Sequence, residues 1–241
     1  MISVGNKATA AAGAHRILDW KPAVRILLYL GGLFTIALGI NLAIKSNLGV
    51  SPVSAFTLPL SQITGISLGT VTILTYVVFV LLQIGTLGKQ FRAKNLLQAP
   101  FSVAFGFFVD FTGHLMKGFH VNGYPMQLAF TVMGILVCAV GAAVYIAMDV
   151  VPNAPEGLIL SICETTGVPF SKMKMLGDCA FVALGIALSL IFMGRVTAIR
   201  EGTVLSALIT GKIIGIIAKR CKPLFQKVVP IKTKMPMVQP S

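Results

Sequence analysis

Long, nearly uninterrupted runs of apolar residues dominate the chain and confine most polar residues to the short segments between them. A helix that crosses a bilayer needs roughly 20 predominantly apolar residues. Six runs reach or approach this length and predict spans over residues 24–44, 66–87, 96–116, 126–148, 175–193 and 203–218. Two further stretches, 53–63 and 157–163, are too short to cross, and predict helices that enter the bilayer and return or lie on its surface.

The second half of the chain repeats the pattern of the first at a spacing of 102 residues. The matches need no gap and include Gly39 with Gly141, Thr64 with Thr166, and Phe79 with Phe181. The two short apolar stretches also fall on each other. Because each half then holds three spans, the second copy enters the membrane from the opposite side. The pattern predicts an all-α membrane bundle of two inverted repeats, residues 24–117 and 125–218, with convergent patterning of apolar helices as the alternative.

The composition agrees with a membrane protein. Apolar residues make up 56% of the chain and charged residues only 11%, whereas soluble proteins carry about 25% charged residues. The net charge is +13, which in a soluble protein would suggest nucleic acid as a partner. Here the basic residues lie mostly between the apolar runs. We therefore expect a lipid bilayer, and no nucleic acid, as the partner.

The distribution of the basic residues predicts that both ends of the chain are cytoplasmic. The segments placed inside carry Lys7, Arg16, Lys21, Arg25, Lys89, Arg92, Lys94, Lys172, Lys174 and the basic residues from 212 to 234. Those placed outside carry only Lys45, Lys117, Arg195 and Arg200. This predicts a cytoplasmic segment over residues 1–23 without a signal peptide, a membrane domain over 24–218, and a basic tail over 219–241 that rests against anionic lipid.

Both short apolar stretches begin with helix-start signals. Ser51 precedes Pro52, while Asn153 precedes Pro155 and Glu156. Ser and Asn cap the free N–H groups of a first helical turn, and proline fits there because it has no N–H to lose. Two such ends meeting inside the bilayer would bind an anion or a polar group. The alternative is a pair of well-capped surface helices.

Asp110 and His114 are spaced to share one face of the third span. A carboxylate in the bilayer normally faces a partner or a water-filled cavity, so this pair predicts a proton-coupling site. The alternative is that His114 is solvated at the outer interface. The remaining polar residues beside apolar runs predict a substrate-binding site of Asn41, Ser51, Asn153, Glu156, Glu201 and Thr203. For Asn41, a hydrogen bond between helices is an equal alternative.

Motifs of known enzymes are missing from the sequence. It has no GxSxG, HExxH or Walker lysine loop, and its four cysteines lack metal-site spacing. We expect neither an enzyme, nor a cofactor, nor a bound metal.

The segment from Ala37 to Leu42, the segment from Ser46 to Pro52 and the Arg200-Glu201-Gly202-Thr203 start of the last span resemble the YczE/YitT membrane proteins of bacteria. The resemblance covers roughly residues 30–218. It implies a multi-pass protein of the bacterial plasma membrane and carries no catalytic residues with it.

Together these features favour a small secondary transporter of a polar or charged solute, with possible proton coupling. The alternative is a membrane scaffold that does not transport and acts through a partner at its basic tail. A homo-oligomer is left open.

Overall fold

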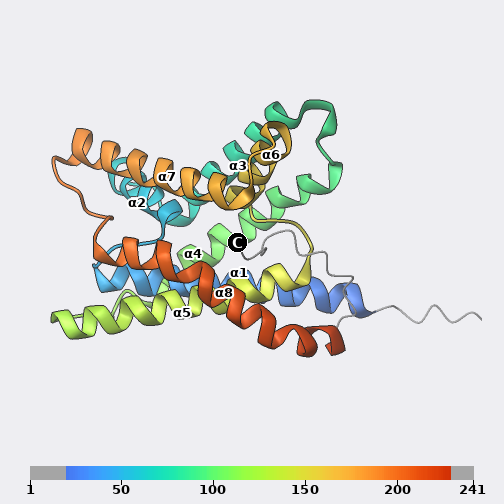
Figure 1. Ribbon diagram of the computed structural model, residues 1–241. Helices are drawn as coiled ribbons and strands as arrows, with labels where there is room; N and C mark the ends of the chain where they lie inside the picture. Colours follow the sequence, from blue (N-terminus) through green and yellow to red (C-terminus); the bar gives the residue numbers. More distant parts are fainter. Residues whose placement is uncertain (1–19, 229–241) are drawn as a thin grey trace, which may run out of the picture.

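The computed structural model describes residues 20–228, and every regular element in this part of the chain is helical (Figure 1). The elements are α1 (Trp20–Ser46), α2 (Pro52–Thr64), α3 (Leu68–Leu87), η1 (Gly88–Gln90), η2 (Ala93–Leu97), α4 (Gln98–Leu115), α5 (Tyr124–Met148), α6 (Ala154–Thr166), α7 (Phe170–Met193) and α8 (Glu201–Val228). The predicted N-terminal segment up to residue 19 and the predicted tail from residue 229 lie outside the described residues.

Six helical segments are long and apolar enough to cross a membrane, which confirms the predicted number of spans. They are α1, α3 with η1, η2 with α4, α5, α7 and α8. Two boundaries differ from the prediction by five residues or more. Helix α7 begins at Phe170 and so includes Lys174, which forms an ion pair with Asp178 one turn further on. Helix α8 continues to Val228, into the residues predicted as the basic tail.

Helices α2 and α6 are the two predicted short segments, and each is 13 residues long. Both end in a glycine in the left-handed region, Gly65 and Gly167, each with φ of 71°. The N–H groups of these glycines donate to the carbonyl oxygens of Ser61 and Cys163 at 2.9 Å. Glycine is favoured there because it has no Cβ to oppose a positive φ. The same stop signal therefore ends both short helices.

The centre of the fold is a close antiparallel contact between α1 and α5. A Cβ atom at Gly39 would lie 2.8 Å from the carbonyl oxygen of Gly134, and one at Gly32 would lie 2.8 Å from that of Gly141. Lipid tails are as apolar as the helices, so close packing of small residues is a main source of helix association in a membrane. These glycines bring the two backbones into direct contact.

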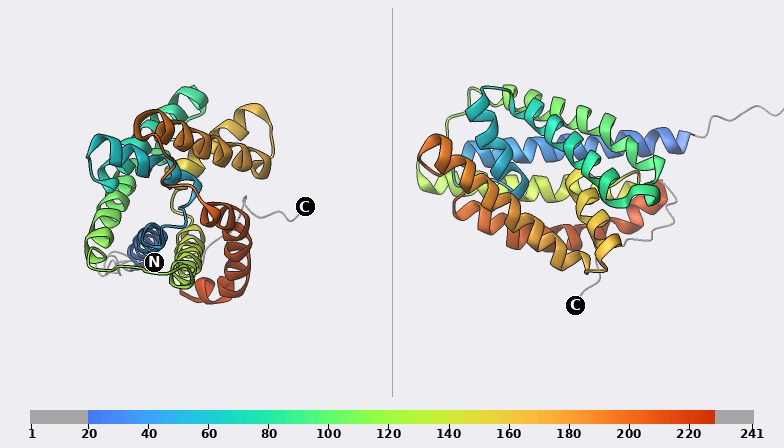
Figure 2. Two further views of the ribbon diagram at one scale, coloured as in Figure 1. Left: turned by 90° about the vertical axis from the view of Figure 1, so that its left-hand side faces the viewer. Right: turned by 90° about the horizontal axis from the view of Figure 1, so that it is seen from above.

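The other helices surround this pair in an arrangement that Figures 1 and 2 show from three sides. Helix α4 packs on α1, and α8 packs on α5. In the second layer the halves of the chain exchange partners, since α3 packs on α6 and α7 packs on α2. Helix α4 also packs closely on α3, whereas α7 and α8 barely touch.

Two contacts join residues that are 102 positions apart in the sequence. The Cys138 thiol lies 3.6 Å from the carbonyl oxygen of Ile36, and the rings of Phe79 and Phe181 lie with their centres 5.4 Å apart. Each contact joins a residue of one half to the residue that it matches in the other.

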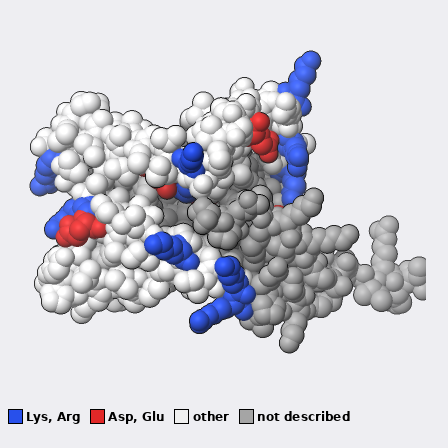
Figure 3. Space-filling model, viewed as in Figure 1, with Lys and Arg blue, Asp and Glu red and all other residues white. Residues whose placement is uncertain are grey.

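The outer surface is largely apolar. The exposed fraction reaches 66% for Leu27 and Phe107, 73% for Ile191 and 65% for Leu208. On the described part of the face in Figure 3, most of the surface carries no charged residue. Such a surface is unfavourable in water and fits contact with lipid.

The glycine contact predicts opposite effects for two substitutions in α1. Gly39→Ala would place Cβ 2.5 Å from the Cys138 sulfur, so we expect a loss of about 1–3 kcal/mol from overpacking. Gly31→Ala meets no atom within 4 Å, and its helix propensity favours a gain of up to about 1 kcal/mol. Thermal unfolding of both variants in detergent measures the difference. Equal melting temperatures would contradict the proposed contact.

Candidate functional site

The first turns of α2 and α6 lie in the main core of the protein. Residues of both turns, Val53 and Ala154, belong to one apolar cluster that also holds three tyrosines: Tyr29, Tyr76 and Tyr145. Tyr76 links the two helices, because it lines a small cavity together with Ser54 of α2 and lies beside Asn153 at the start of α6. The two helix starts are therefore interior features rather than surface ones.

Glu156 contributes an acidic side chain to this part of the core. It lies in the first turn of α6, and its Oε2 atom is buried without a hydrogen-bond partner among the described residues. All three tyrosines are close enough to interact electrostatically with the Glu156 carboxylate. On the other side α7 contributes Lys174 and Asp178, which form an ion pair at 2.6 Å.

The surroundings of Glu156 favour its neutral form. Helix α6 is not one of the six spans. Burial raises the pKa of the Glu156 carboxyl above its ordinary value, while the Lys174 ammonium opposes the shift. A carboxyl that loses its charge on protonation is the group that a proton-coupled protein needs in its interior.

The two predicted capping residues behave differently. The Asn153 Oδ1 atom accepts from the backbone N–H of Ala154 at 3.1 Å. The Ser51 hydroxyl makes no cap; it lies 2.9 Å from the hydroxyl of Ser54. The side chain of Ser51 therefore leaves the first N–H groups of α2 unbonded, and such groups favour an anion or a polar ligand.

The remaining residues of the predicted substrate site are spread over the fold. Asn41 is buried and donates to the Val109 carbonyl oxygen at 2.9 Å and to the Thr112 hydroxyl at 2.8 Å, so it ties α1 to α4. Thr203 is buried in α8 against Gly49, close to the start of α2. Glu201 is exposed at the start of α8, where it lies 3.4 Å from Arg200, and does not reach the interior.

Asp110 belongs to α4, and its carboxylate lies against the start of α3 rather than in the core beside the starts of α2 and α6. Its Oδ1 atom accepts from the Gly69 N–H at 2.7 Å, and its Oδ2 atom accepts from the Ser67 hydroxyl at 2.6 Å. A carboxylate at a helix N-terminus is stabilised by the free N–H groups and by the helix dipole. His114 is exposed one turn further along α4. The proton-coupling role of this pair stays a prediction, and the observed contacts are those of a cap.

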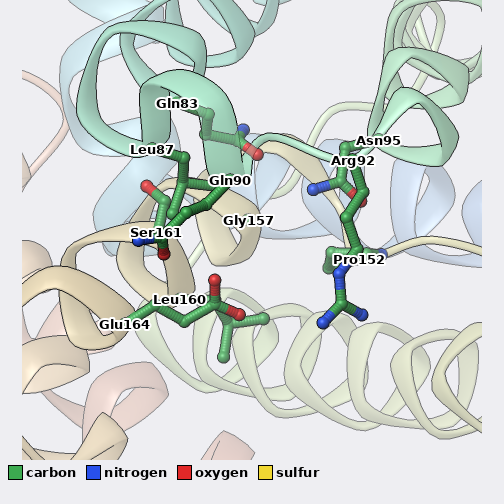
Figure 4. Close-up of a pocket in the computed structure, with 10 residues that line it drawn as sticks. All are labelled: Gln83, Leu87, Gln90, Arg92, Asn95, Pro152, Gly157, Leu160, Ser161 and Glu164. Carbon is green, nitrogen blue, oxygen red and sulfur yellow. The ribbon is translucent and has the colours of Figure 1, made fainter. Parts of the chain in front are cut away.

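A pocket of about 160 Å³ lies between the C-terminal part of α3, the α3–α4 connection and α6 (Figure 4). Its walls carry charged and amide side chains, and its lining residues are Gln83, Leu87, Gln90, Arg92, Asn95, Pro152, Gly157, Leu160, Ser161 and Glu164. The carboxylate of Glu164 and the guanidinium of Arg92 point into the same space from opposite walls.

The matching corner at the other end of the molecule is closed. The Thr197 hydroxyl donates to Gln62 Oε1 at 3.1 Å, and the Val50 N–H donates to the Ala198 carbonyl oxygen at 3.2 Å. Gly185 packs directly on the backbone of Ala55. The two ends therefore differ, since one holds this pocket and the other is bridged by direct contacts between the α7–α8 connection and the residues around α2.

Sequence reasoning missed several of these features. The tyrosines lie within apolar spans, and only Tyr76 carries a signal in the sequence, because it falls opposite the acidic Asp178 at the 102-residue spacing. The basic α3–α4 connection was interpreted only as a topology signal, so its pocket was not foreseen. Among residues 22–220, whose side chains are described, no group of three His, Cys, Asp or Glu residues is placed to hold a metal.

A family model described as a family of unknown function (DUF6198) matches residues 23–219, nearly the whole described part of the chain. No curated protein and no solved structure matches the chain.

The Asp110 contacts predict a structural effect that His114 does not share. Asp110→Ala removes both acceptors at the start of α3, so we expect a loss of about 1–2 kcal/mol in the free energy of unfolding. His114→Ala alters an exposed side chain and changes it by no more than about 0.5 kcal/mol. Thermal unfolding in detergent compares the two. Equal effects would argue against the cap.

Proposed function

The chain belongs to the DUF6198 family of unknown function, and we propose that it is a small secondary transporter of a polar or charged solute. One observation carries the proposal. Two short helices of equal length, α2 and α6, begin in the core and pack against a helix of the opposite half of the chain. Many transporters bind their solute where such broken or short helices meet near the middle of the membrane.

The two halves are inverted repeats in this proposal. The contact of Gly39 with Gly134 becomes the contact of Gly141 with Gly32 when each residue is replaced by its match 102 positions away. The pairs Ile36–Cys138 and Phe79–Phe181 join matched residues directly and mark a two-fold axis. Because α1 and α5 run antiparallel, this axis lies in the plane of the membrane. The pairing of α3 with α6 and of α7 with α2 supports the same symmetry.

Glu156 is the proton-coupling group in this proposal, in place of Asp110. Its Oε2 atom is buried and unpartnered, whereas both Asp110 oxygens are occupied by donors at the start of α3. Protonation removes a charge that the core around Glu156 solvates poorly. The tyrosine hydroxyls and the start of α2 supply polar groups for the solute within the same region.

The difference between the two ends supports alternating access. Helix α3 packs on α4, but α7 has almost no contact with α8, so the symmetry of the halves is broken in this conformation. The pocket beside the α3–α4 connection and the direct contacts beside the α7–α8 connection are a second difference between the halves. A transporter of inverted repeats reaches its other state when the two halves exchange these conformations.

In this proposal both ends of the chain are cytoplasmic, in the plasma membrane of a bacterium. Six spans place the two ends on one side, and the basic residues favour the cytoplasm for that side. The residues from Ala37 to Leu42 and from Ser46 to Pro52 further suggest the YczE/YitT group.

Transport is tested in proteoliposomes that enclose the pH-sensitive dye pyranine. We expect amino acids, small organic acids or amines, added outside one at a time, to drive a solute-dependent pH change inside. Glu156→Gln removes the titrating group, so this coupled proton flux falls at least tenfold. The dye fluorescence measures the flux directly.

Asp149→Asn is the matched control, because it makes the same acid-to-amide change at an exposed residue whose positive φ suits asparagine. We expect it to keep the flux. A wild-type protein that is folded yet moves none of these solutes would overturn the transporter proposal and favour the scaffold. An unchanged flux in Glu156→Gln would overturn the coupling role alone.

Orientation is tested by thiol labelling in intact cells, starting from a variant whose four cysteines are replaced by alanine. Gly118→Cys lies in the α4–α5 connection, and a membrane-impermeant maleimide should label it from outside. Lys94→Cys lies in the α3–α4 connection and should react only after the cells are permeabilised. The reverse pattern would contradict cytoplasmic termini.

A further inference from the structure

We propose that the pocket beside the α3–α4 connection is the cytoplasmic binding site for a small zwitterion, with Arg92 on its carboxylate and Glu164 on its ammonium group. This inference rests on the proposed transport function and narrows its substrate to a chemical class. The volume of about 160 Å³ suits a small organic solute and far exceeds the roughly 10–15 Å³ needed for one water.

The two charges are available to a ligand. Arg92 and Glu164 are both exposed, and neither forms an ion pair with another described residue. Both line the pocket and point into its interior, so a ligand placed there reaches both (Figure 4). A guanidinium binds a carboxylate through two parallel hydrogen bonds, and a carboxylate accepts from an ammonium group. Opposite charges on facing walls therefore fit a ligand that carries both charges itself.

The floor of the pocket includes Gln83, which forms a buried amide pair with Gln98. Gln83 and Gln98 are buried and bond to each other in both directions, at 2.9 and 3.1 Å. A Cβ at Gly157 would lie within 2.9 Å of both amides, so only glycine leaves room for them at this position. Because these two amides are occupied, Arg92 and Glu164 supply the charged groups for recognition.

The floor also connects the pocket to the core site. Gln83 donates to the Ala154 carbonyl oxygen at 3.3 Å, in the first turn of α6. Glu156 lies in the same turn. Gln83 therefore joins the pocket lining to the first turn of α6.

The opposite corner shows that the fold does not need these charges. The residue that matches Glu164 at the 102-residue spacing is Gln62, which is uncharged and is bonded to Thr197. The Arg200 guanidinium also contacts that corner, where it donates to the Asn47 carbonyl oxygen at 3.0 Å. The carboxylate of Glu164 therefore has no acidic counterpart at its matching position.

The test is protection of a cysteine at the pocket rim in the cysteine-free background. Gln90 is exposed and lines the pocket, so Gln90→Cys should react readily with N-ethylmaleimide in purified protein. We expect glycine and L-alanine to slow the reaction at least threefold, while acetate and methylammonium at the same concentration do not. Leu160→Cys, on the α6 wall, provides a second labelling position.

Charge removal identifies the groups responsible. Arg92→Gln and Glu164→Gln should each weaken protection by glycine about tenfold or more, as loss of a charge-assisted hydrogen bond predicts. Lys94→Gln removes an equal charge from the same connection outside the pocket lining and should keep protection. Protection by acetate or methylammonium alone, protection that survives both substitutions, or no protection by either amino acid would overturn the proposal.

The test separates this inference from the transporter proposal because labelling in detergent needs no transport. Protection that depends on Arg92 and Glu164 without solute flux in proteoliposomes would support the site and contradict transport. Flux that is unaffected by Arg92→Gln and Glu164→Gln would support transport and contradict the site.

Discussion

The glycine-mediated contact between α1 and α5 is the constraint on which the other helix positions depend. Lipid offers no hydrophobic gain for bringing two apolar helices together, so small residues that allow backbone contact provide the attraction. Gly32 and Gly39 on one helix meet Gly141 and Gly134 on the other. With this pair fixed, α4 and α8 flank it, and the second layer places the starts of α2 and α6 in the core.

Apolar run lengths were sufficient to predict the spans, because the thickness of the bilayer sets the length of a crossing helix. They were less accurate for α6, because the apolar run covers only residues 157–163 whereas the helix begins at Ala154. Asn153, Pro155 and Glu156 interrupt the apolar run although they form the helix start. Basic residues also interrupt the apolar runs at the start of α7 and at the end of α8, so the predicted spans are shorter than these helices. In α7 one of these residues, Lys174, forms an ion pair with Asp178.

The site was less predictable, because its properties depend on which polar groups meet in space. Asp110 and Glu156 are both acids beside apolar runs, and only the fold shows that Asp110 has two donors while one Glu156 oxygen has none. For Asn41, the structure has the hydrogen bond between helices that the sequence leaves as an equal alternative to substrate binding. The pocket joins residues of α3, the α3–α4 connection and α6, so no local pattern in the sequence reveals it.

Alternation between two states that exchange the conformations of the halves is the central claim. A short methanethiosulfonate cross-linker between cysteines at Gln62 and Thr197, whose side chains lie 3.1 Å apart in the closed corner, tests it directly. The account predicts that cross-linking stops solute-driven proton flux and that reduction restores it, because this corner must open in every cycle. Full flux through the cross-linked protein would contradict alternating access.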